Sequence, residues 1–239
     1  FFSVPKMPTY APKDPEEEAA WEELVDNIRE AAARGDSAFN LSQSPVLTAV
    51  PDDIKLLKKN VKTLHIDNNY ALASLPRTLG ELTLLTWLNV SYNQLTELPA
   101  CIGRLTKLQR LHVNNNHLTS LPLDIWNLKD LEELQADTNK IKALPTGVLE
   151  MRKLNKLILY NNPLLAPEDV TTNVEEKVPP PPLVGDCSLT RQKFTECFVH
   201  LSFHDICGNS KIPVVHYLAD VKALELMKTL LLEKYGVSS

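Results

Sequence analysis

The sequence has few glycines and none of the short motifs that mark common active sites. Only 7 of its 239 residues are glycine, and they form no G-x-x-x-x-G-K-S/T phosphate loop. The sequence also contains neither the G-x-S-x-G nucleophile motif nor the H-E-x-x-H zinc-protease motif. Only scattered acids and histidines remain as catalytic candidates. We therefore expect a protein that is not an enzyme and has no cofactor.

Long apolar runs and long basic runs are missing as well. No apolar stretch approaches the roughly 18 residues that a membrane-spanning helix needs. The formal net charge is −5, and lysine and arginine form no basic run. An acidic chain of this kind does not suit a nucleic acid as its main partner. We therefore expect neither a membrane span nor a nucleic-acid partner.

What the sequence does contain is one pattern written three times at an interval of 23 residues. Its first copy consists of apolar residues with one asparagine and one proline, at Leu85, Leu88, Val90, Asn93, Leu95, Leu98, Pro99, Ile102 and Leu105. Further copies start at Leu108 and Leu131, Leu154 opens a final half copy, and two looser copies open at Phe39 and Val61. A constant period carrying L-x-x-L-x-L-x-x-N-x-L is the signature of a leucine-rich repeat solenoid, here with about six repeats over residues 38–167.

This repeat predicts an α/β fold. Each inner L-x-L forms a short strand, and neighbouring strands stack into a parallel sheet on the concave face. The segment L-P-x-x-I-x-x-L returns along the convex face as a short helical turn that begins at the proline. Asparagines recur where the strands turn away, at Asn69, Asn93, Asn116, Asn139 and Asn162. We interpret them as a ladder whose amides satisfy backbone groups of the turns, rather than as a binding site.

Cysteine is scarce, and its spacing bears on the compartment. The four cysteines are Cys101, Cys187, Cys197 and Cys207, and no C-x-x-C occurs. Extracellular repeat proteins usually close their ends with paired cysteines, and such pairs are missing here. We therefore expect a reducing, intracellular environment, in the first place the cytoplasm. A mitochondrion or another organelle stays open if Phe1 is the new end left by removal of a targeting segment.

Residues 1–37 are predicted to be an extended arm followed by a capping helix. Asp14 is a suitable N-cap and Pro15 a suitable first helical residue, and Arg34 and Gly35 mark the end of the helix. Apolar residues recur at helical spacing at Trp21, Leu24, Val25, Ile28, Ala31 and Ala32. We expect this stripe to cover the open end of the first repeat. Recruitment of a partner helix is the alternative.

Two further regions are predicted after the repeats. Residues 168–186 contain the run Pro179–Pro182, which indicates a stiff linker or, alternatively, a ligand for an aromatic groove. Residues 187–239 are predicted to be a small helical domain with a second helix starting at Pro213, although F-V-H-L-S-F also fits a strand. A domain this short needs support, either from the C-terminal end of the solenoid or from a partner.

Four side chains in the C-terminal part have the residue types of a zinc site, namely Cys197, His200, His204 and Cys207. On one continuous helix these positions span about 15 Å, at about 1.5 Å per residue. The four ligands of a single zinc ion must all lie about 2.0–2.3 Å from it. We therefore expect no metal site and interpret the cysteines as small core residues.

Two resemblances to known families follow from these residues. The repeats resemble the intracellular, Ras-suppressor-like class of leucine-rich repeat proteins, and this resemblance implies the fold but says little about function. The tail carries the motif D-x-C-G-x-x-x-I-P-x-x-H-Y-L, from Asp205 to Leu218. That motif is similar to the C-terminal segment of leucine-rich repeat-containing protein 58 and its relatives.

Solenoids of this kind usually bind partners on the concave face, so the outward strand positions are the candidate site. The candidate residues are His65, Trp87, Tyr92, Arg110, His112, Glu133, Lys156 and Tyr160. Tryptophan, tyrosine and arginine are the residue types enriched at interface hot spots. A tryptophan at a solvent-facing strand position is hard to explain by packing alone. Two alternatives stay open, a solvated face of mixed charge without a partner and docking through the convex face.

The sequence therefore predicts a protein–protein interaction module or scaffold, anchored in a larger hetero-complex by its C-terminal helices. One alternative is a substrate receptor of a ubiquitin ligase, because Ile212-Pro213 and Tyr217-Leu218 resemble the end of a cullin-docking box. The S-L-x-x-x-C element of such a box is missing, since Lys193 stands where the cysteine would follow Ser188-Leu189. Another alternative is an accessory structural subunit of an organellar or cytoskeletal complex.

Overall fold

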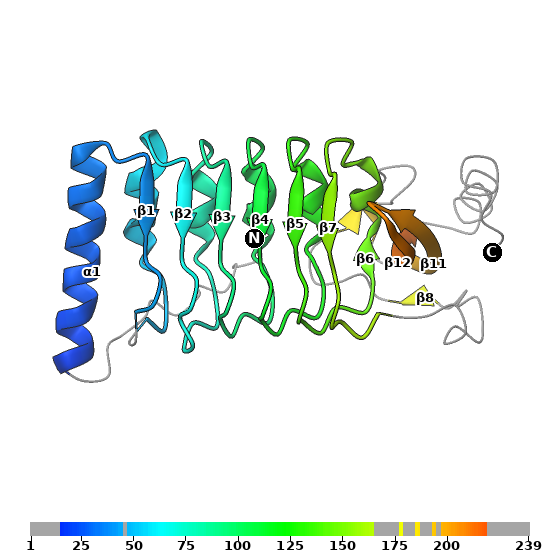
Figure 1. Ribbon diagram of the computed structural model, residues 1–239, viewed down its shortest axis with the longest axis horizontal. Helices are drawn as coiled ribbons and strands as arrows, with labels where there is room; N and C mark the ends of the chain where they lie inside the picture. Colours follow the sequence, from blue (N-terminus) through cyan, green and yellow to red (C-terminus); the bar gives the residue numbers. More distant parts are fainter. Residues whose placement is uncertain are drawn as a thin grey trace.

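The computed structural model describes residues 15–44, 47–164, 177–178, 185–186, 193–194 and 197–218. The helix α1 (Pro15–Arg34) precedes a parallel sheet of six short strands in the order β1-β2-β3-β4-β5-β7. These strands are β1 (Ala38–Asn40), β2 (Thr63–His65), β3 (Trp87–Asn89), β4 (Arg110–His112), β5 (Glu133–Gln135) and β7 (Lys156–Ile158). Figure 1 shows α1 at one end of the row of strands and a long hairpin at the other end.

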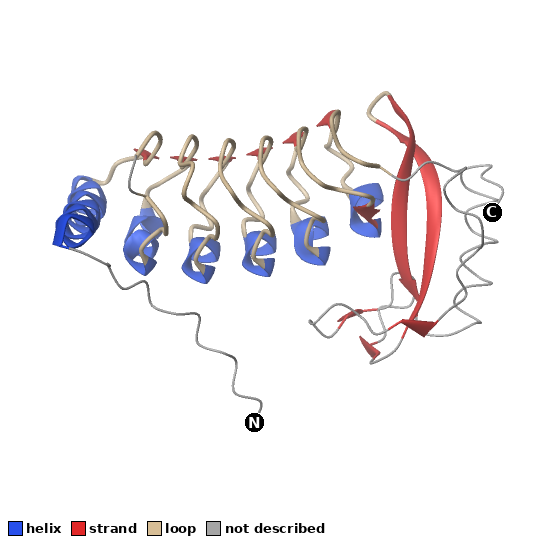
Figure 2. Ribbon diagram, turned by 90° about the horizontal axis from the view of Figure 1, so that it is seen from below, coloured by secondary structure: helices blue, strands red, loops and turns tan. Residues whose placement is uncertain are grey.

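Short 3₁₀ helices alternate with the strands and lie on the other side of the molecule from the sheet (Figure 2). They are η1 (Asp52–Lys59), η2 (Arg77–Glu81), η3 (Ala100–Arg104), η4 (Leu123–Asn127) and η5 (Thr146–Glu150). Each begins directly after a proline in the extended conformation, at Pro51, Pro76, Pro99, Pro122 and Pro145. The predicted α/β solenoid, with convex helical turns that start at a proline, is therefore confirmed.

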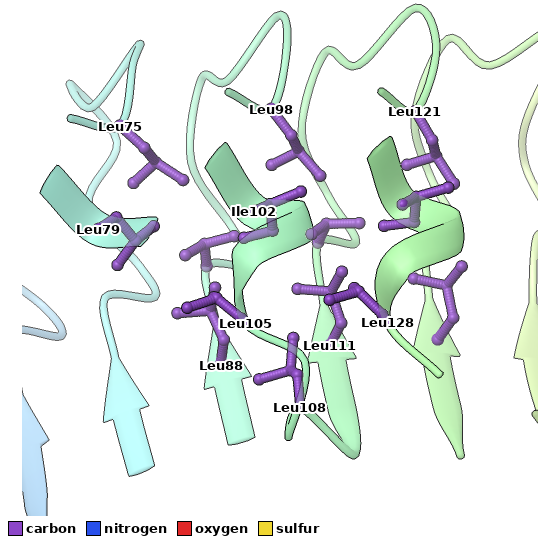
Figure 3. Close-up of a cluster of buried hydrophobic side chains, with 14 of the residues drawn as sticks. Leu75, Leu79, Leu88, Leu98, Ile102, Leu105, Leu108, Leu111, Leu121 and Leu128 are labelled. Carbon is purple, nitrogen blue, oxygen red and sulfur yellow. The ribbon is translucent and has the colours of Figure 1, made fainter. Parts of the chain in front are cut away.

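The register of the sheet follows the repeat. The central leucines Leu64, Leu88, Leu111, Leu134 and Leu157 are paired from strand to strand, and all five are buried. Figure 3 shows Leu88 and Leu111 meeting side chains of the convex turns. Because each leucine packs on its equivalents in the next repeat, the core is one continuous stack, as predicted.

The asparagines form the predicted ladder. The amide nitrogen of Asn116 donates to the carbonyl of Val113 in its own repeat and to that of Val90 in the preceding repeat, both at 3.0 Å. Its oxygen accepts the backbone N–H of Leu95 at 3.0 Å. The amide of Asn139 makes equivalent bonds one repeat later. These buried amides satisfy backbone groups that the short strands leave unpaired.

Where two neighbouring convex turns from η2 to η5 touch, one of the two residues in contact is a glycine. A Cβ atom added at Gly103 of η3 would lie 2.5 Å from the backbone oxygen of Asp124 in η4. At the next contact the order of the two residues is reversed. The earlier turn, η4, carries the large residue Trp126, and a Cβ added at Gly147 of η5 would overlap the Cβ of Trp126. Both glycines are therefore required by close approach of the next or preceding turn.

The N-terminal end is closed by α1, as predicted. Val25, Ile28 and Ala31 of this helix are buried, and Ile28 and Ala31 belong to the continuous core. Gly35 ends the helix with a φ of +75°, which glycine adopts at little cost. The proposed N-cap Asp14 and the arm before it lie outside the described residues.

The predicted C-terminal helices are wrong over the part that the structure describes. Strands β11 (Cys197–Ile206) and β12 (Asn209–Leu218) form an antiparallel hairpin, so no helix starts at Pro213. The two-residue turn between them has positive φ at Cys207 and Gly208, +50° and +79°. The physical reason lies in the F-V-H-L-S-F segment, whose apolar and polar residues alternate as in a strand. Residues 219–239 lie outside the described part.

The hairpin closes the C-terminal end of the solenoid. Strand β12 pairs in parallel with β6 (Leu144–Pro145), and Ile206, Ile212 and Val214 are buried in the continuous core. The sequence predicts that the tail needs support from the end of the solenoid or from a partner. The contact of β12 with the last repeats is the first of these. The predicted linker contributes the short strands β8 (Lys177–Val178) and β9 (Gly185–Asp186), which pair with β11 and with β10 (Lys193–Phe194). Its proline run lies outside the described residues.

Candidate functional site

Trp87 is the centre of the concave face, by which we mean the solvent side of the six-stranded sheet. Its ring lies edge-on to the ring of His65, with 4.8 Å between centroids, and to that of His112, with 5.9 Å between centroids. The guanidinium carbon of Arg110 lies 5.3 Å from the Trp87 ring centroid. These contacts follow from the register, because β2, β3 and β4 are adjacent strands.

The sequence places Trp87 outward because its neighbour Leu88 points into the core and side chains alternate along a strand. The indole nitrogen of Trp87 is buried, and it has no hydrogen-bond acceptor among the residues that the structure describes. A buried N–H without an acceptor is energetically unfavourable. The group of side chains around Trp87 therefore contains a hydrogen-bond donor that the described part of the chain does not use.

Glu133 connects this aromatic group to the C-terminal repeats. One of its carboxylate oxygens accepts the ammonium of Lys156 at 2.7 Å and the side-chain amide of Gln135. The same oxygen lies 3.4 Å from Nε2 of His112. Burial alone would raise the pKa of Glu133, but the hydrogen bonds from Lys156 and Gln135 outweigh it and lower the pKa. Glu133 is therefore ionised at neutral pH, and its charge is offset by Lys156.

His112 lies between Trp87 and Glu133, and its side chain is only 16% exposed. Burial lowers the pKa of His112 below its ordinary value, and the nearby cations Lys156 and Arg110 act in the same direction. The negative charge of Glu133 opposes the effect without cancelling it. His112 is therefore neutral at pH 7.

Asp67 occupies the other end of the same surface. Its carboxylate accepts hydrogen bonds from the hydroxyl of Ser42 at 2.7 Å and from the amide of Asn89 at 3.0 Å. The Nδ1 atom of His65 lies 3.6 Å from the same carboxylate. Contacts therefore run without a break from Asp67 through His65, Trp87, His112 and Glu133 to Lys156.

Two tyrosines project at the edge where the strands turn away. Tyr92 is 45% exposed and Tyr160 is 64% exposed. The charge of Asp137, together with a hydrogen bond to that carboxylate, raises the pKa of Tyr160. Tyr92 has a φ of +57°, a conformation that is unfavourable for a bulky side chain. Tyr92 therefore holds an exposed aromatic ring at the cost of local backbone strain.

The structure thus brings together six of the eight candidate residues, namely His65, Trp87, Arg110, His112, Glu133 and Lys156. Tyr92 and Tyr160 stand beside this group at the strand ends. Asp67, Gln135 and Asp137 make the hydrogen bonds described above but were not among the candidates. The repeat had already placed them in the outward columns, so a search for partners of each charged side chain would have found them. Binding by these residues stays a prediction.

The four zinc candidates lie along β11 and its turn instead of on a helix. An extended strand rises about 3.3 Å per residue, so Cys197 and Cys207 are roughly 30 Å apart along the chain. A single ion cannot bridge that distance. Among the described residues, no group of three or more His, Cys, Asp or Glu side chains is close enough to hold a metal ion. Within the same residues, no helix has the length and apolar character needed to cross a bilayer.

The repeated strand, asparagine ladder and proline-led convex turn define a leucine-rich repeat solenoid. A family model described as a leucine-rich repeat region matches residues 52–157, and the chain is a leucine-rich repeat protein over this region. The fold generally mediates protein–protein interaction. No curated protein is significantly similar in sequence to this chain.

Several solved structures are similar over the repeats. A leucine-rich repeat protein of Leptospira interrogans is 31% identical with a TM-score of 0.46, and the match covers 56% of this chain and 40% of that one. YopM of Yersinia enterocolitica is 29% identical with a TM-score of 0.48, and the match covers 61% of this chain and 29% of that one. The chain thus spans less than half the length of either protein.

Proposed function

We propose that this protein is a non-enzymatic interaction module that binds a partner protein on its concave face, centred on Trp87. The carrying observation is the continuous contact group from Asp67 to Lys156, with Trp87 at its middle. A half-buried tryptophan flanked by an arginine and polar groups is the composition of an interface hot spot. Rigid strands hold it in place, so little order has to be created on binding.

Tyr92 gives independent support for this face. An exposed, bulky residue in a left-handed conformation costs roughly 1–3 kcal/mol. The same backbone position, also with positive φ, is taken by polar residues in other repeats, at Asn68, Asn115, Thr138 and Asn161. Asparagine tolerates this φ better than tyrosine does. The backbone conformation therefore does not explain why this position holds a tyrosine. A role of Tyr92 in binding is consistent with its exposure.

The C-terminal hairpin contributes to this function by closing the solenoid. The segment Ile212-Pro213, which resembles part of a cullin-docking box, is buried against the last repeats. A cullin adaptor could not reach Ile212 while the hairpin is folded. We therefore assign the partner contact to the concave face, within a hetero-complex whose other members are proteins.

The test compares partners of the full chain with those of matched variants by affinity purification and quantitative mass spectrometry. Trp87→Ala and Arg110→Ala change the concave face, whereas Arg77→Ala changes an exposed arginine at the start of η2 on the convex side. Partners lost with both concave variants and kept with Arg77→Ala support the proposal. Partners lost only with Arg77→Ala would instead place docking on the convex face.

A further inference from the structure

Each carboxylate of the concave face accepts hydrogen bonds from donors of this chain. Asp67 accepts bonds from the Ser42 hydroxyl and the Asn89 amide. Glu133 accepts bonds from Lys156 and Gln135. Both bonds to Glu133 reach the same carboxylate oxygen, and the second oxygen of Asp67 accepts the side-chain amide of Asn68 at 2.6 Å. The negative charge of each acid is therefore offset by donors of this chain, which weakens its attraction for a positively charged group of a partner.

Asp137 completes this pattern. It is 4% exposed and is bonded to Tyr160 and, at 3.4 Å, to the hydroxyl of Thr138. The Asp137 carboxylate is therefore buried, and its charge is offset by hydrogen-bond donors. Each of these three acids is therefore paired with donors of this chain.

Arg110 is the opposite case. Its guanidinium has no ion pair or hydrogen bond among the described residues, and the side chain is exposed. Its strand neighbour Glu133 is near enough in register to pair with it, but that carboxylate is turned to Lys156 and Gln135. The charged group of the concave face that has no ionic partner among the described residues is therefore the positive guanidinium of Arg110.

The position of Arg110 over Trp87 makes this charge suited to one kind of ligand. A guanidinium lying over an aromatic ring keeps its N–H groups available around its edge, where a carboxylate can accept two of them side by side. Stacking on Trp87 also restricts the side chain, so less freedom is lost on binding. The indole N–H of Trp87, which lacks an acceptor within the described part, adds to the local excess of donors.

We propose that Arg110, held over Trp87, binds the carboxylate of an aspartate or glutamate in a partner polypeptide. This inference rests on the proposed function and names the chemistry of its partner. A carboxylate suits the site better than a phosphate group, because phosphate sites usually gather several arginines and Arg110 stands alone beside the anion Glu133. The partner therefore presents an acidic side chain to the third and fourth repeats of the six-stranded array.

The test uses the full chain and a displayed library of random peptides. Wild type is expected to enrich peptides that contain Asp or Glu. In a synthetic copy of an enriched peptide, changing that acid to its amide should weaken binding about tenfold or more. Arg110→Gln should weaken binding of the acidic peptide to the same extent and remove its advantage over the amide peptide. The matched control Arg77→Gln should change neither affinity.

The possible results separate the two proposals. Peptides that bind wild type, fail on Trp87→Ala and show no dependence on Arg110 or on an acid would overturn the acidic-partner inference and leave the concave-face function standing. Peptides indifferent to both Trp87 and Arg110 would count against both. A phosphoserine at the acidic position that binds more tightly than glutamate would overturn the carboxylate assignment. A library without any enriched binder would also overturn it, and the partner comparison above would still test the function.

Discussion

The side-chain amide of Asn209 donates a hydrogen bond of 2.9 Å to the backbone carbonyl of Leu157, the central leucine of the last strand in the sheet. It also donates to the carbonyls three and two residues before it, at 3.2 and 3.4 Å. The ladder residue Asn162 contacts the carbonyls three and two residues before it in the same way. The hairpin turn therefore continues the asparagine ladder beyond the last repeat.

Asn209→Ala should lower the free energy of unfolding by about 1–3 kcal/mol, because it leaves the Leu157 carbonyl without this donor. Chemical denaturation of the full chain measures the change. Ser210→Ala, at the adjacent exposed position, is the control and should have an effect within about 0.5 kcal/mol. Equal effects of the two substitutions would show that Asn209 does not hold the hairpin to the solenoid.

Removal of the C-terminal part should expose the end of the core. Ile206, Ile212 and Val214 of the hairpin are buried against the last repeats, so a fragment of residues 1–170 would present that apolar surface to water. We expect this fragment to aggregate or to melt at a lower temperature than the full chain. Size-exclusion chromatography and thermal unfolding check this. A monomeric fragment as heat-stable as the full chain would show that the hairpin is dispensable for the solenoid.

Leu111→Ala should destabilise the protein by about 2–5 kcal/mol, because this fully buried leucine sits between equivalent leucines of the neighbouring strands. The measurement is the free energy of unfolding in denaturant. Lys107→Ala, at a nearby exposed position, is the control. An unchanged stability of Leu111→Ala would contradict the register of the repeats.

Tyr92→Asn should increase the free energy of unfolding by roughly 1 kcal/mol, because asparagine tolerates the left-handed conformation that Tyr92 adopts. The same substitution should weaken partner binding, because it removes an exposed aromatic ring. Tyr70→Asn is the matched control, since Tyr70 is 71% exposed and has no positive φ. A loss of stability in Tyr92→Asn would show that the tyrosine ring contributes to folding after all.

The protein should lose stability as the pH falls from 7 toward 5, and His112 should account for part of this loss. Its folded pKa lies below the ordinary value of 6.5, mainly because it is buried. In that window the unfolded chain binds more protons than the folded chain, so protonation favours unfolding. Denaturation at several pH values should show a smaller loss in His112→Asn than in wild type. The same slope in both proteins would exclude this contribution.

The repeats could be predicted from the sequence because one constraint acts at every copy. Leucines at fixed spacing must face the core, so the residue before each central leucine, such as Trp87, Arg110 or Glu133, must face outward in adjacent strands. That is enough to predict the surface and its column of residues. It is not enough to predict the contacts, because Arg110 has both Trp87 and Glu133 as strand neighbours. The choice between stacking and ion pairing depends on Lys156 and Gln135, which draw the carboxylate away.

The C-terminal part is harder to predict because its pattern supports two interpretations. Phe194, Phe198 and Leu201 have helical spacing, whereas Val199, Leu201 and Phe203 alternate as in a strand. Pairing favours the strand, because β11 pairs with β12, and β12 pairs in turn with β6, a segment far away in the chain. Local sequence carries no information about those neighbours, so the residues of the hairpin allow a strand without deciding between strand and helix.

The contacts of η4 with its two neighbouring turns limit which repeats can be duplicated or exchanged along the solenoid. Gly103 makes room for η4, whereas Trp126 of η4 needs the space that Gly147 leaves. A second copy of the η4 repeat inserted after the first would place Trp126 against an aspartate instead of a glycine. The leucine stack alone would accept that duplication, but the convex surface would not. These repeats therefore cannot be copied or exchanged freely, and their order along the chain is specified by shape.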